Sequence, residues 1–122
     1  MRIFLILALF LPSVLADELR LVAYNIHHGE GMDGKLDLGR IAKVIAAEKP
    51  DLVALQEVDK VCKRSGGVDQ AAELARLLKM EHSFGKFMDY QGGEYGMAVL
   101  SRFPIEKTVI HKHPKGAEPR IA

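Results

Sequence analysis

The chain has 122 residues, of which 48% are hydrophobic and 27% charged, with one cysteine and a formal net charge of +1. This length suits one domain or part of one, and the hydrophobic share excludes a disordered chain, because such chains are depleted in apolar residues. The single cysteine, Cys62, excludes an internal disulfide. A buried or incidental thiol is a simpler interpretation of it than a nucleophile.

Residues 1–16, MRIFLILALFLPSVLA, have the pattern of a secretory signal peptide. Arg2 precedes an apolar stretch that runs from Ile3 to Leu11, and after Pro12 the residues Val14 and Ala16 give a small-residue cleavage pattern. A membrane anchor is the alternative, but a spanning helix needs about 20 apolar residues. We therefore expect export to the periplasm or the medium, a mature chain without a transmembrane segment, and a domain over residues 17–122.

Removal of residues 1–16 takes away one of the 17 basic side chains and none of the 16 acidic ones, which leaves a formally neutral product. Domains that grip a nucleic-acid backbone usually carry a basic surplus, because contacts from Lys and Arg to phosphates supply most of the non-specific affinity. Nucleic acid is therefore a possible partner but not the favoured one.

The first half of the mature chain predicts a strand, a loop and a helix. Residues 19–26, LRLVAYNI, are rich in branched and aromatic residues, and the following HHGEGMDG contains three glycines. Asp37 is a suitable N-cap, and Pro50 marks the stop. Between them the apolar residues recur at helical spacing, at Leu38, Ile41, Ala42 and Ile45.

The second half predicts a further helix and several strands. Residues 52–55 are apolar at every position, which is typical of a strand covered on both faces. After two glycines, a helix is indicated by an apolar stripe at Ala71, Leu74, Ala75 and Leu78. The remaining segments predict a weaker strand at 81–90, a turn or loop at 91–96, a strand at 97–103, an edge strand at 105–113 and the start of another strand at 118–122.

The element order β-α-β-α-β-β-β predicts an α/β fold, with a mixed sheet and two helices on one of its faces. A sheet with two helices needs more chain to cover its remaining surface. We therefore expect a partial α/β sandwich, the first half of a larger domain, whose exposed apolar face favours low solubility or association with a partner chain.

Two strand ends carry polar residues suited to metal binding. Asn25 follows the first apolar run, and Glu57 follows the run DLVALQ. If these strands are neighbours, both side chains lie at one edge of the sheet, where α/β proteins commonly bind ligands. Amide and carboxylate oxygens suit Mg²⁺. The alternatives are a turn-forming asparagine and a solvated glutamate.

Four blocks in this order and at these separations resemble the N-terminal half of the endonuclease/exonuclease/phosphatase family of metal-dependent phosphohydrolases. They are YNIHHGEG, DLVALQEV, YGMAVLSRFPI and EPR, spread over residues 24–120. The resemblance implies that Asn25 lies in the catalytic centre and that Glu57 binds Mg²⁺ or Mn²⁺ directly. It also implies hydrolysis of a phosphoester, in which the cation neutralises charge on the phosphoryl oxygens.

Other groups within the matched blocks have candidate roles. His27 and His28 lie on the glycine-rich loop, where an imidazole suits a phosphate oxygen or a headgroup, although exposed loop histidines are as common. By resemblance Tyr95 donates its hydroxyl to phosphate; a half-buried tyrosine with an ordinary partner is the alternative. Arg120 suits an anion clamp or a solvated surface charge.

The sequence also departs from the family pattern. Met97 stands where the family often has asparagine, and the Gly-Asp-x-Asn and Ser-Asp-His blocks are not found. We therefore expect an exported Mg²⁺-dependent phosphodiesterase or phosphatase, acting on phospholipid headgroups or other phosphoesters and represented by an N-terminal fragment. The alternative is an inactive fragment or pseudoenzyme that binds at most a cation or phosphate.

Overall fold

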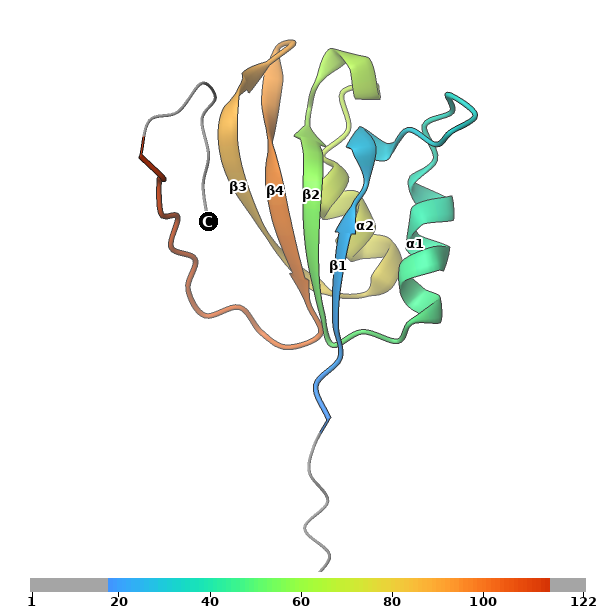
Figure 1. Cartoon of the computed structure of the whole chain (residues 1–122), viewed down its shortest axis with the longest axis vertical. Helices are drawn as coiled ribbons and strands as arrows, with labels where there is room; N and C mark the ends of the chain where they lie inside the picture. Colours follow the sequence, from blue (N-terminus) through green and yellow to red (C-terminus); the bar gives the residue numbers. More distant parts are fainter. Residues whose placement is uncertain (1–17, 115–122) are drawn as a thin grey trace, which may run out of the picture.

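The computed structural model describes residues 18–114, which form one four-stranded mixed sheet with two helices on one of its faces (Figure 1). The strand order is β1-β2-β4-β3, with β1 and β2 parallel and the other pairs antiparallel. The elements are β1 (Leu21–Asn25), a 3₁₀ turn η1 (His27–Gly29), α1 (Leu38–Ala47), β2 (Leu52–Lys60), a 3₁₀ turn η2 (Lys63–Ser65), α2 (Gln70–Leu78), β3 (Glu81–Tyr90) and β4 (Gly93–Ser101). No helix in this part of the chain combines the length and apolar character of a membrane span.

Both predicted helices are confirmed, and each begins at an aspartate cap. The carboxylate of Asp37 accepts a hydrogen bond from the Arg40 backbone N–H at 2.8 Å, and Asp69 caps α2 in the same way. Each cap satisfies a donor that has no partner within the helix. The inward stripes are those that the sequence predicts. Leu38 and Leu78 are partly buried against the core, and the other members are buried: Ile41, Ala42, Ile45, Ala71, Leu74 and Ala75.

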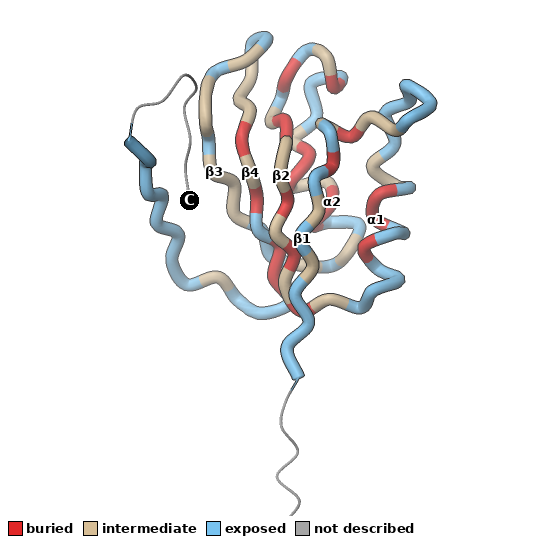
Figure 2. Tube along the Cα trace, in the orientation of Figure 1, coloured by how far each residue is buried: buried red, intermediate tan, exposed pale blue. Residues whose placement is uncertain are grey.

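The core lies between the helices and the strands β2 and β4, where buried residues gather (Figure 2). Val53, Leu55 and Leu100 are fully buried there. They alternate along their strands with less buried residues, so only one face of the central strands is covered by helices in the described structure. The expectation that residues 52–55 are covered on both faces is therefore wrong for this part of the chain, because an apolar run does not itself specify what covers it.

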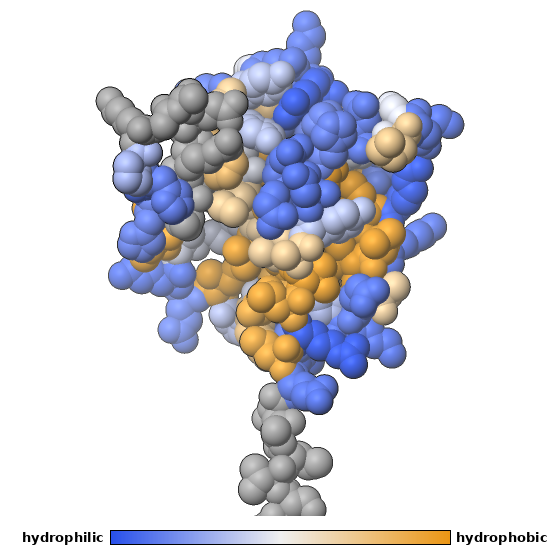
Figure 3. Space-filling model, in the orientation of Figure 1, coloured by the Kyte–Doolittle hydropathy of each residue, from blue (hydrophilic) through white to orange (hydrophobic). Residues whose placement is uncertain are grey.

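The opposite face of the sheet, which we call the open face, carries an apolar surface over β1, β2 and β4 (Figure 3). Leu21 is 65% exposed and Val99 is 45% exposed, and Leu52 and Ala54 lie between them in the pairing register. Association through this face remains a prediction.

The end of β2 and the start of β4 differ from those expected. β2 continues to Lys60 instead of stopping near Leu55, and β4 already begins at Gly93. Only Gln91 and Gly92 make the turn, both with positive φ, which is the conformation of a tight hairpin whose twist matches its strands. The glycines at 92 and 93 therefore mark a two-residue turn within a long hairpin, not a loop over 91–96.

The predicted edge strand at 105–113 is wrong. Apart from a single bridge at Lys112 the segment has no strand structure, and a 2.7 Å hydrogen bond between the hydroxyls of Ser83 and Thr108 ties it to β3. Val109 and Ile110 are about half exposed, so the apolar positions that suggested alternation have little to pack against. The strand expected at 118–122 and Arg120 lie outside the described residues.

Candidate functional site

Asn25 and Glu57 meet at one edge of the sheet, as the sequence predicts. Asn25 is the last residue of β1 and pairs in register with Gln56 of the parallel strand β2. The amide nitrogen Nδ2 of Asn25 donates a hydrogen bond to Oε1 of Glu57 at 2.9 Å. The carboxyl ends of two neighbouring parallel strands thus place an amide and a carboxylate in direct contact.

A β-bulge positions Glu57. The pairing of β2 with β4 runs from Leu55 opposite Ala98 to Val58 opposite Gly96, so Gln56 and Glu57 together face one residue of β4. Glu57 has φ of +57°, a left-handed conformation that costs a non-glycine residue on the order of 1 kcal/mol or more. The strand does not end on the carboxylate but kinks there, as bulges next to active sites commonly do.

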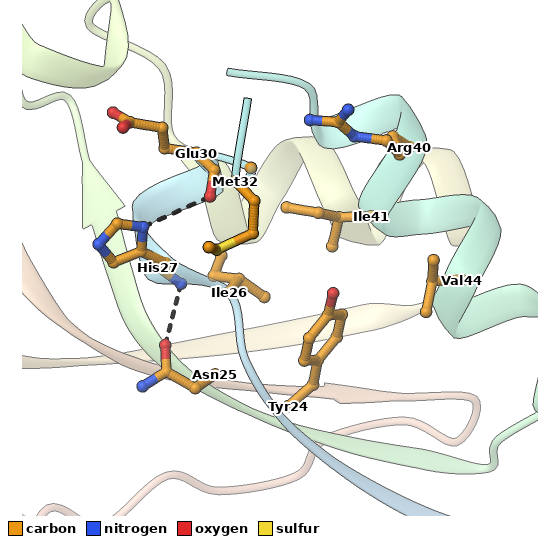
Figure 4. Close-up of a pocket in the computed structure, with 11 residues that line it drawn as sticks. Tyr24, Asn25, Ile26, His27, Glu30, Met32, Arg40, Ile41 and Val44 are labelled. Atoms are coloured by element: carbon orange, nitrogen blue, oxygen red, sulfur yellow. Dashed lines mark hydrogen bonds between the residues drawn. The ribbon is translucent and has the colours of Figure 1, made fainter. Parts of the chain in front are cut away.

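The orientation of the Asn25 side chain follows from its second hydrogen bond. Its oxygen Oδ1 accepts from the backbone N–H of His27 at 2.9 Å (Figure 4). Because an N–H can only donate, the amide oxygen must face His27 and the amide nitrogen must face Glu57. Asn25 therefore links η1 to the bulge, and it restrains the carboxylate of Glu57 through one of its two oxygens.

His27 and His28 complete a group with Glu57. One ligand-type atom from each of the three residues lies within 4.8 Å of the other two. His28 and Glu57 are half-buried and His27 is exposed, and the two imidazole rings lie 4.4 Å apart between centroids. Among the described residues, this is a cluster of nitrogen and oxygen donors that fits a divalent metal ion.

The buried side chain of Gln70 joins η1 to β2 next to the site. Its Oε1 accepts from the Asp59 backbone N–H at 3.0 Å, and its Nε2 donates to the carbonyl of His28 at 2.7 Å. Only 1% of Gln70 is exposed. The sequence carried a signal for this residue, since Gln70 lies four positions before Leu74 and therefore places an amide at the N-terminal end of the buried face of α2.

A buried ion pair lies beside the same edge. Asp59 is fully buried and accepts two 2.8 Å hydrogen bonds from the guanidinium of Arg64, in a paired arrangement. Burial by itself raises the pKa of Asp59, but hydrogen bonds from Arg64 and Ser65 outweigh it and hold this pKa below its ordinary value. The sequence alone does not identify Asp59, because a buried pair between β2 and η2 has no local sequence signature.

Tyr95 lies on β4 opposite Asp59, among aromatic rings and the guanidinium of Arg64. Its ring centroid is 5.9 Å from that of Phe87 in an edge-to-face arrangement, and the Arg64 guanidinium carbon is 5.4 Å from the Tyr95 ring. The strand register thus brings Tyr95 to the edge that holds Glu57. A role in phosphate binding stays a prediction for both Tyr95 and His28.

A pocket of about 460 Å³ opens between η1, the outer side of β1 and α1 (Figure 4). Asn25 and His27 line one part of it, and Tyr24, Ile41 and Val44 line another. Arg40 also borders it, but its guanidinium is paired with Asp33 through hydrogen bonds of 3.0 and 3.1 Å. The pocket therefore offers an apolar surface next to the polar cluster.

The sequence that carries this site matches a known protein family. The family model described as Endonuclease/Exonuclease/phosphatase family matches residues 22–121. No match was found among curated proteins. Among solved structures, an endonuclease/exonuclease/phosphatase from Beutenbergia cavernae DSM 12333 is 32% identical with a TM-score of 0.63, over 79% of this chain and 29% of that one.

An endonuclease/exonuclease/phosphatase family protein from Leptotrichia buccalis C-1013-b shares the fold, with 18% identity and a TM-score of 0.56, over 78% of this chain and 42% of the other. The chain thus spans less than half the length of either structure. The match over residues 22–121, together with the Asn25–Glu57 contact at the sheet edge, shows that this chain belongs to the endonuclease/exonuclease/phosphatase family.

Proposed function

We propose that residues 17–122 form the N-terminal part of a metal-dependent phosphoester hydrolase, in which Glu57 binds a divalent cation, Mg²⁺ or Mn²⁺. The observation that carries the proposal is the 2.9 Å contact between Asn25 and Glu57 at the carboxyl ends of two parallel strands. The bound cation would neutralise charge that develops on the phosphoryl oxygens. Asn25 holds the carboxylate in one orientation through its own two hydrogen bonds.

The remaining predicted site residues have supporting roles in this proposal. His28 and Tyr95 are contacts for phosphate oxygens, and Arg120 is a further anion contact outside the described residues. Asn25 is also a proposed metal ligand; its oxygen already accepts from His27, so ligation would use the second lone pair of that oxygen.

The substrate that we propose is a phospholipid headgroup or a small phosphoester, with nucleic acid less favoured. The neutral mature chain and the apolar pocket beside Asn25 and His27 support an organic group in preference to a polyanion. We expect Val44→Arg, which places a charge at the apolar part of the pocket, to raise KM for headgroup substrates more than for p-nitrophenyl phosphate. Equal effects on both substrates would argue against a role for the pocket.

Export is part of the proposal and rests on residues 1–16. Expression of the intact gene product followed by fractionation and N-terminal sequencing tests it directly. We expect the exported product to begin at Asp17. A chain that keeps Met1 in the cytoplasm would contradict the assignment.

Metal-dependent hydrolysis is tested by comparing Glu57→Gln with Glu81→Gln. Both changes remove one carboxylate charge, but Glu81 is exposed and begins β3 at the opposite end of the sheet, by the pairing of Glu81 and Leu52 with Ser101. We expect hydrolysis of bis-p-nitrophenyl phosphate or p-nitrophenyl phosphate to require Mg²⁺, to stop with a chelator, and to fall at least about 100-fold in Glu57→Gln only. Full activity of Glu57→Gln would remove this residue from the metal site.

A second candidate function is binding of a cation and phosphate without turnover. Its support is that the chain spans 29% and 42% of the lengths of the two similar structures and that the Gly-Asp-x-Asn and Ser-Asp-His blocks are missing from the sequence. Phosphate binding followed by ³¹P NMR, with no turnover in the presence of Mg²⁺, is the expected result. Sustained Mg²⁺-dependent turnover by the purified chain would exclude it.

A further inference from the structure

Two imidazoles lie beside the proposed metal-binding carboxylate, and a magnesium site does not need them. Mg²⁺ takes oxygen ligands in octahedral geometry and keeps several of its waters. His27, His28 and Glu57 together offer two ring nitrogens and one carboxylate oxygen within 4.8 Å of one another. The donor set at this edge is therefore richer in nitrogen than the proposed magnesium chemistry requires.

The backbone conformation that places both rings at this position is strained. His27 has φ of +47° and His28 has φ of +43°, so two consecutive non-glycine residues are left-handed. Each such residue costs about 1–2 kcal/mol, and strain of this kind concentrates at functional sites. Hydrogen bonds from Gly29 to Ile26 at 2.9 Å and from Gln70 to His28 at 2.7 Å hold the turn in place.

Glu30 contacts both imidazole rings. Its backbone carbonyl lies 3.4 Å from Nδ1 of His27, and its carboxylate lies 3.5 Å from Nε2 of His28. A ring nitrogen that donates to such an oxygen leaves the other ring nitrogen as an acceptor, which is the usual support for a metal-bound histidine. Each imidazole thus has one nitrogen close to an oxygen of Glu30, and we take the other nitrogen of each ring as the metal ligand.

Two histidines and one glutamate form a set that binds Zn²⁺ with an open coordination position. Bonds of about 2.0–2.2 Å in a tetrahedral arrangement place ligand atoms roughly 3.3–3.6 Å apart. The three groups already lie within 4.8 Å, so side-chain rotations suffice to close the site. Imidazole ligands favour the later first-row ions over Mg²⁺.

We propose that His27, His28 and Glu57 form a site for a transition-metal dication, with Zn²⁺ bound more tightly than Mn²⁺ and Mn²⁺ more tightly than Mg²⁺. The inference shares Glu57 with the proposed function, but it assigns His28 to the metal ion instead of to a phosphate oxygen and replaces Mg²⁺ by Zn²⁺ as the preferred ion. The inference states which class of metal ion the site selects. It can be tested by measuring metal binding alone, without any assay of hydrolysis.

Calorimetric titration of the purified chain with each ion in a non-chelating buffer tests the proposal. We expect one Zn²⁺ per chain, bound at least about 100-fold more tightly than Mg²⁺. His27→Ala and His28→Ala should each weaken Zn²⁺ binding by at least about 10-fold, with less than about a threefold effect on Mg²⁺. Glu57→Gln should weaken both ions, and His82→Ala, at an exposed position on β3, should weaken neither.

A second measurement uses only the wild-type chain and so does not depend on the folding of any variant. In ¹H–¹⁵N spectra of the histidine rings, Zn²⁺ should shift the His27 and His28 signals and leave that of His82 in place. Shifts confined to other histidines, or Zn²⁺ bound no more tightly than Mg²⁺, would overturn the proposal. If the chain hydrolyses phosphoesters with Mg²⁺ but binds Zn²⁺ no more tightly than Mg²⁺, this inference fails and the proposed function stands. If Zn²⁺ binds at these rings but no hydrolysis occurs, this inference is supported and the result counts against the hydrolase.

Discussion

Replacing Gln70 with methionine is expected to lower the free energy of unfolding by about 2–4 kcal/mol. The change keeps the size of the side chain, so it leaves little cavity. It removes both polar atoms, so the Asp59 N–H and the His28 carbonyl lose their partners at 3.0 and 2.7 Å. The perturbation therefore isolates the hydrogen bonds that join η1 to β2.

The magnitude follows from the burial of the two groups that lose a partner. A buried polar group left without a partner costs about 1–3 kcal/mol. Asp59 is fully buried, so its N–H is expected to incur most of that cost. His28 is half-buried, and water can replace part of the bond to its carbonyl.

Urea unfolding followed by circular dichroism measures the loss, and hydrogen exchange at the Asp59 amide locates it. Gln91→Met is the matched control, because Gln91 is exposed in the β3–β4 turn and the same substitution should change stability by less than about 0.5 kcal/mol. Exchange at Asp59 should become faster only in Gln70→Met. Unchanged stability together with unchanged exchange at Asp59 would refute the reasoning.

Four further predictions concern charge and packing. Arg64→Leu should cost on the order of 3 kcal/mol in urea unfolding, because it leaves the buried Asp59 carboxylate unpaired. The pKa of Asp59 is lower in the folded state than in the unfolded state, where it is near 4. The stability that the pair contributes is therefore fully present above the unfolded pKa and is lost as the pH falls through the folded pKa. A loss of stability on raising the pH would contradict this direction. Hydrogen bonds from Arg40 lower the pKa of Asp33 to about 2, so carboxyl ¹³C titration should show that value and Arg40→Gln should raise it. Gly96→Ala should destabilise the chain by about 1–3 kcal/mol in thermal unfolding, because its Cβ would overlap a β3 carbonyl, and a neutral effect would show that the hairpin adapts.

Local patterns predicted the helices and the position of Asn25. The caps Asp37 and Asp69 satisfy hydrogen bonds within three residues along the chain, and an apolar stripe reports directly which helix face is buried. The parallel pairing of β1 and β2, which brings Asn25 to Glu57, follows from the intervening helix. These features depend on short-range chemistry, so the sequence shows them.

The bulge and the ion pair depend on contacts that the sequence does not display. Glu57 was expected just beyond a strand, whereas it sits inside one, because nothing in QEV distinguishes a strand end from a kink. Asp59 and Arg64 are five residues apart, a spacing that suggests no pairing until η2 folds the chain back. Residues 105–113 alternate like a strand, but alternation does not identify a partner edge.

The bulge in β2 makes the site sensitive to the number of residues and not only to their identity. Two residues separate Leu55 from Val58, while one residue separates their partners on β4. A one-codon deletion there would restore regular pairing and remove the left-handed residue that presents the carboxylate. Engineering of this domain should therefore tolerate changes of length in its connecting turns far better than in the middle of its second strand.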